Sequence, residues 1–143
     1  MITMLHSGWA YITVLILIIA VANAIIGVTS NKEFQEKDLR IPLFALIIAH
    51  IQLLIGLVAY FTSAQFALLK ESGMGAAMQD PEIRLVVMEH PLMMILAVIL
   101  MTVGFSKHKN KSSDKAKFKT IALYYGVALL FILSRIPWDK WFN

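Results

Sequence analysis

Four long apolar runs are the feature that most constrains how this chain can fold. They cover roughly Trp9–Thr29, Ile41–Phe61, Leu85–Phe105 and Thr120–Ile136. Each approaches the ~20 residues that an α-helix needs to cross a bilayer. A soluble domain of 143 residues, of which 59% are hydrophobic and 15% charged, would be unable to bury so much apolar surface. The sequence therefore predicts an all-α protein, a four-transmembrane-helix up-down bundle.

We expect this bundle to form a single integral membrane domain over residues 1–143. Its helices are expected at about 6–29, 41–66, 81–106 and 119–136.

The basic residues predict the orientation of the bundle in the membrane. Residues 106–119 carry six lysines against one aspartate, and the 31–40 loop adds three more basic residues. Because Lys and Arg mark cytoplasmic loops, we expect both loops inside, as topology signals rather than a nucleic-acid site, and both termini outside.

The third run is interrupted by the polar sequence Glu89-His90-Pro91. Its helix is expected to begin at Asp80-Pro81-Glu82, where the aspartate caps the first turn and proline takes the first helical position. Pro91 then lies inside the helix and removes the amide that would bond to Val87. The sequence thus predicts a disturbed helix directly beside an intramembrane histidine and carboxylate.

Three histidines, His6, His50 and His90, lie within the apolar runs, whereas His108 lies in the lysine-rich loop and is interpreted as an ordinary loop residue. The face of His6 holds Ala10, Thr13, Leu17, Ala20, Ala24 and Gly27. The face of His90 holds Met94, Ala97, Met101 and Gly104. His50 shares a face with Leu46, Leu53, Leu57 and Tyr60, beside a stripe of Ala45, Ala49, Gln52, Gly56 and Ala59. Small residues here either let helices approach closely or make room for a flat macrocycle.

Ionisable groups at membrane depth are costly, so each is a functional hypothesis. The chain has no cysteine, which excludes disulfides and thiolate metal sites. Neutral imidazole suits iron, copper or zinc, and haem b held by histidines needs only an apolar pocket and cations near its propionates. Arg84 and Arg135 are candidates for those cations, or else extend to the membrane interface. We favour His6 with His90 as ligands; His50 is a third candidate ligand or part of a quinone or proton site.

Four sequence blocks carry a resemblance over nearly the whole chain: LHSGWAYITVLILI, IIAHIQLLIGLVAYF, VVMEHPLMMILAVILMTVGFSK and KTIALYYGVALLFILSRIPW. Together they resemble small bacterial four-helix membrane proteins labelled cytochrome b-like. The resemblance implies bound haem b and a bacterial inner (cytoplasmic) membrane. It departs at Phe118, where that family often has a further histidine. In pattern alone, the histidine positions also resemble the haem-type protoporphyrinogen oxidase and copper-resistance protein D families.

The leading hypothesis is a haem b-binding membrane protein that relays electrons, with the quinone pool or as a subunit of a respiratory complex. The first alternative is a copper-handling protein, because methionines gather around His90 in sequence and thioether suits Cu(I). They are Met74, Met78, Met88, Met93 and Met94. The second alternative is a cofactor-free scaffold subunit, whose tail PWDKWFN anchors at the outer interface. The sequence leaves open whether any reaction is catalysed.

Overall fold

The computed structural model describes residues 1–141, which are mostly helical and contain no strand. Three unbroken long helices are α1 (Ile2–Thr29), α2 (Glu36–Phe61) and α6 (Asp114–Ser134). The fourth long helix is continuous through three segments, α4 (Pro81–Arg84), η1 (Leu85–Glu89) and α5 (His90–His108). All four are long and apolar enough to cross a membrane. The prediction of an all-α chain with four membrane-spanning helices is therefore confirmed, and the chain is a multi-pass membrane protein.

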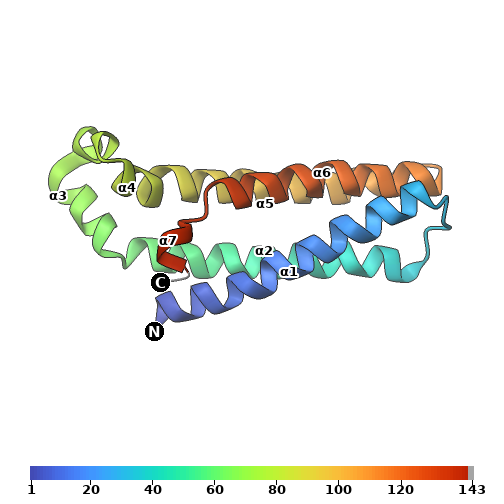
Figure 1. The fold of residues 1–143 in the computed structure, drawn as a ribbon, viewed down its shortest axis with the longest axis horizontal. Helices are drawn as coiled ribbons and strands as arrows, with labels where there is room; N and C mark the ends of the chain where they lie inside the picture. Colours follow the sequence, from blue (N-terminus) through green and yellow to red (C-terminus); the bar gives the residue numbers. More distant parts are fainter. Residues whose placement is uncertain (142–143) are drawn as a thin grey trace.

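The four long helices run alternately in opposite directions (Figure 1). Both termini lie at one end of the bundle, together with α3 (Ala64–Gln79) and α7 (Trp138–Trp141). The connection between α1 and α2 and the lysine-rich connection between α5 and α6 lie at the opposite end (Figure 1). This arrangement agrees with termini and basic loops on opposite sides of a membrane, and which side is cytoplasmic stays a prediction. Of the tail PWDKWFN, residues 142–143 lie outside the described residues.

The small-residue faces of two helices are buried where the periodicity placed them. In α1 the buried residues are Thr13, Leu17, Ala20, Ala24 and Gly27. In α5 they include Ala97, Met101 and Gly104. A Cβ on Gly27 would lie 2.4 Å from the Phe118 ring, and one on Gly104 would lie 2.3 Å from Tyr124. At these two glycines, the small residues serve close helix packing.

The helix ends differ from the expected ones, and at both ends of the second helix local capping is the reason. The second helix begins at Glu36 rather than near 41, since Gln35 and Asp38 form a reciprocal capping box. It stops at Phe61 rather than 66, because Ser63 caps the separate helix α3 by accepting from the Phe66 amide. The first helix starts at Ile2 instead of 6, and the last spans Asp114–Ser134 instead of 119–136.

The interpretation of His108 as an ordinary loop residue is wrong. The third long helix continues to His108, which is buried and donates through Nδ1 to the Phe105 carbonyl. Phe34 packs over it, with the two ring centroids 5.5 Å apart. Phe34 also contacts Phe118, at 4.9 Å between ring centroids. Aromatic rings therefore fill this end of the bundle, and Phe118 lies among them.

Candidate functional site

The helix that carries His90 is wider than an α-helix just before that residue. Leu85–Glu89 form a π-helical turn, in which the amide of His90 donates to the carbonyl of Leu85. The Val87 carbonyl would lack a donor because Pro91 has no N–H, and the Tyr60 hydroxyl from α2 donates to it at 2.9 Å. The disturbance expected at Pro91 thus takes the form of a π-helical turn that a hydrogen bond from Tyr60 stabilises. Such turns are frequent at functional sites.

His90 is held in one orientation by the end of the last long helix. Its Nδ1 lies 2.8 Å from the carbonyl oxygen of Arg135. Because a carbonyl only accepts, Nδ1 carries the proton and Nε2 keeps its lone pair. The ring faces His6 of α1 at a centroid distance of 6.2 Å, with the two planes at 84°. The structure therefore brings together the two histidines that the sequence favoured as a pair.

His6 is held by α2. The Gln52 side-chain nitrogen donates to the His6 carbonyl at 2.9 Å and lies 3.1 Å from His6 Nδ1. Gln52 Oε1 is buried and has no hydrogen-bond partner within residues 1–141. Gly56, one turn further along α2, leaves room for the imidazole, since a Cβ there would lie 3.1 Å from His6 Cε1. Both histidines are therefore positioned by hydrogen bonds from neighbouring helices.

A charged cluster lies beside the histidine pair. Glu89 accepts from Arg84 Nε at 2.8 Å and lies 3.7 Å from Arg135 Nε. Arg84 also donates to the Met78 carbonyl at 2.9 Å. The three charged side chains are each about one-third to two-fifths exposed, so the cluster lies at the edge of the bundle. Both arginines that the sequence singled out thus lie at this end, joined through Glu89.

His50 is not part of this group. It is exposed on the outer surface of α2, and its Nδ1 bonds to the Leu46 carbonyl of its own helix at 2.8 Å. The buried side of α2 is the small stripe, with Ala45 and Ala49 in the core. Sequence reasoning gave no role to Gln52 or Tyr60, although polar residues in an apolar run were a signal that could have pointed to both.

Groups of three or more histidine, aspartate or glutamate side chains able to hold a metal ion are absent among residues 1–141. The arrangement instead offers two facing imidazoles, each held by a hydrogen-bond partner, next to two arginines. No family model, curated protein or solved structure matches this chain. The functional argument therefore depends on the geometry of these side chains.

Proposed function

We propose that the protein is a haem b-binding membrane protein that relays electrons, in which His6 and His90 would hold the haem iron. The supporting observation is the 6.2 Å between the two imidazole centroids. Metal–imidazole bonds of about 2 Å place two rings that ligate one metal from opposite sides about 6 Å apart, centre to centre. The resemblance to small cytochrome b-like proteins favours the same cofactor.

The donor set suits haem better than a bare metal ion. A metal held by side chains alone usually needs three or four donors, whereas a porphyrin supplies four nitrogens and leaves two axial positions. When bound, haem supplies reversible one-electron chemistry at its iron. The Arg135 carbonyl keeps the proton of His90 on Nδ1 and so leaves Nε2 free to ligate.

For His6 the same role requires a proton on Nδ1. A rotation of the Gln52 amide would turn its unpartnered Oε1 toward Nδ1 as the acceptor for that proton, in exchange for the hydrogen bond that Gln52 Nε2 donates to the His6 carbonyl. Arg84 and Arg135 are the cations that would receive propionates, in competition with Glu89. Residues of this chain therefore orient both imidazoles and provide positive charge at one end of the apolar bundle.

The electron partners and the membrane are part of the same proposal. We place the protein in a bacterial inner membrane with its basic loops in the cytoplasm, supported by the lysine bias and by the shared end of the two termini. Quinone, or further subunits of a respiratory complex, are the proposed redox partners. Exposed apolar side chains along α1 and α2 leave surface for lipid and for such partners.

The test is an absorption spectrum of the detergent-purified protein, produced with ample haem and recorded oxidised and dithionite-reduced. We expect the sharp reduced bands of a six-coordinate haem. His6→Ala and His90→Ala should each lose these bands, and added imidazole should restore part of them. His50→Ala is the matched control and should keep the spectrum. A colourless, folded protein, or an unchanged spectrum in His90→Ala, would contradict the proposal.

A further inference from the structure

A hollow opens at the end of the bundle that holds both termini. It lies between α3, α4 and α7 and has a volume of about 200 Å³. The residues around it are Ala64, Gln65, Leu68, Glu82, Ile83 and Lys140. This volume is below the ~300–1,000 Å³ of pockets for drug-sized ligands, so it suits a chemical group of a few heavy atoms.

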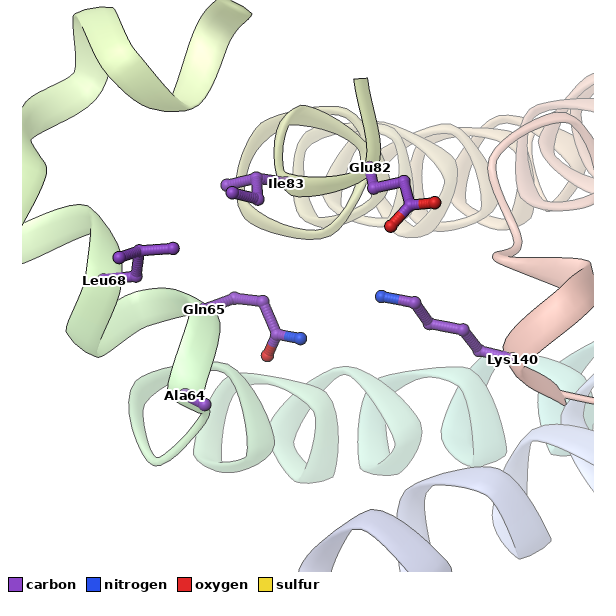
Figure 2. A pocket seen from close by; sticks show the side chains of 6 residues that line it. All are labelled: Ala64, Gln65, Leu68, Glu82, Ile83 and Lys140. Carbon is purple, nitrogen blue, oxygen red and sulfur yellow. The ribbon is translucent and has the colours of Figure 1, made fainter. Parts of the chain in front are cut away.

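Two opposite charges face each other across this hollow. Figure 2 shows the Glu82 carboxylate and the Lys140 ammonium pointing into the same space, with the Gln65 amide beside them. Across the described part of the chain, neither charge takes part in an ion pair. Separated charges of this kind complement a ligand that itself carries a cation and an anion a few ångströms apart.

The helices around the hollow carry residues that are typical of the membrane–water interface. α3 follows directly on the apolar helix α2, and α7 carries two tryptophans. Trp141 stacks on Tyr11 of α1 at 4.5 Å between ring centroids, which holds α7 against the bundle, and Trp138 is 40% exposed. Tyr and Trp gather at the depth of lipid head groups. A charged hollow at this depth therefore opens where phospholipid head groups lie.

We propose that this hollow binds the head group of an aminophospholipid, which carries a phosphate and a primary ammonium. Lys140 and the Gln65 amide bind the phosphate, and Glu82 binds the ammonium. Leu68 and Ile83 form an apolar wall against the rest of the lipid. The site uses none of the residues proposed to hold haem, so either proposal can fail without the other.

The experiment compares two short-chain lipids on the purified, full-length protein by native mass spectrometry. Phosphatidylethanolamine carries both charges, and phosphatidylglycerol with the same acyl chains carries only the phosphate. We expect wild type to prefer phosphatidylethanolamine by up to about fivefold, the upper end for an exposed charge pair such as Glu82 would form with the ammonium. Glu82→Gln should abolish this preference, and Lys140→Gln should weaken binding of both lipids. The matched controls Glu71→Gln and Lys111→Gln, which change charges outside the hollow, should retain it.

A charge swap separates lipid binding from a direct ion pair between the two side chains. The double variant Glu82→Lys/Lys140→Glu keeps opposite charges but reverses their order, whereas the phosphate of a phospholipid always lies nearer the glycerol. We expect the swap to lose the preference. A preference retained by the swap would overturn the proposal, as would equal binding of the two lipids by wild type. Free O-phosphoethanolamine that competes as well as the lipid would indicate a soluble ligand and refute a lipid site.

Discussion

Tyr60→Phe tests how the π-helical turn before His90 is stabilised. The Tyr60 hydroxyl donates to the Val87 carbonyl, which Pro91 deprives of its usual amide donor. Val87 is buried, so without the hydroxyl its carbonyl oxygen loses a hydrogen bond away from water. Hydrogen bonds between membrane helices contribute about 0.6 kcal/mol on average, and an unpaired buried carbonyl costs roughly 1–3 kcal/mol. We expect Tyr60→Phe to lower the free energy of unfolding by about 1 kcal/mol.

The assay is reversible unfolding in mixed micelles, run as a double-mutant cycle with Pro91→Ala. Alanine restores an N–H at position 91, so Tyr60→Phe should cost less than half as much in that background. Tyr125→Phe is the matched control. Its hydroxyl donates to the Pro42 carbonyl at 2.8 Å, inside α2, and its cost should not depend on residue 91. An equal cost of Tyr60→Phe in both backgrounds would refute the reasoning.

The remaining predictions also concern stability, and thermal unfolding in detergent measures each. Gly104→Ala should lower the stability of the protein by about 1–3 kcal/mol, because the added Cβ would lie 2.3 Å from Tyr124. The control Gly126→Ala should be neutral or slightly stabilising, since nothing lies within 4 Å of its Cβ. Equal effects of the two substitutions would contradict the close packing at Gly104. Asp38→Ala should cost about 2 kcal/mol, because the buried carboxylate accepts from Asn23 and the Gln35 amide. The control Glu36→Ala removes an exposed ion pair with Arg40 and should cost under ~1 kcal/mol of stability. A larger loss of stability in Glu36→Ala than in Asp38→Ala would be inconsistent with the burial of Asp38.

The membrane helices could be predicted from sequence because a lipid environment restricts the backbone to conformations that satisfy its own hydrogen bonds. In a bilayer every amide must bond within the chain, so an apolar run of sufficient length becomes a helix. The small-residue faces of α1 and α5 were also predictable, since Ala and Gly mark where helices touch. In α2 the periodicity left two neighbouring faces open, and the buried one holds Ala45 and Ala49 rather than His50.

The site was only half predictable, for physical reasons. The pair His6 and His90 follows from composition and approximate depth, which sequence supplies. The partners of these histidines do not: the Arg135 carbonyl and Gln52 are brought to them by the packing of other helices. The burial of His108 was not predicted, because the lysines around it in the sequence indicate a solvent-exposed loop. In the structure the helix continues to His108, and Phe34 packs over its ring.

The hydrogen bond between His90 and Arg135 has a consequence for biosynthesis. Among the four long helices, α1, which carries His6, leaves the ribosome before the others, and Arg135 follows the last of them, so residues far apart in the sequence meet at His90. The contact between the two imidazoles, with His90 held by Arg135, is therefore complete only after all four long helices have been inserted. A nascent chain that stalls before α6 has both histidines but lacks the carbonyl that fixes His90. Binding of the proposed haem would then report that all four long helices have been inserted.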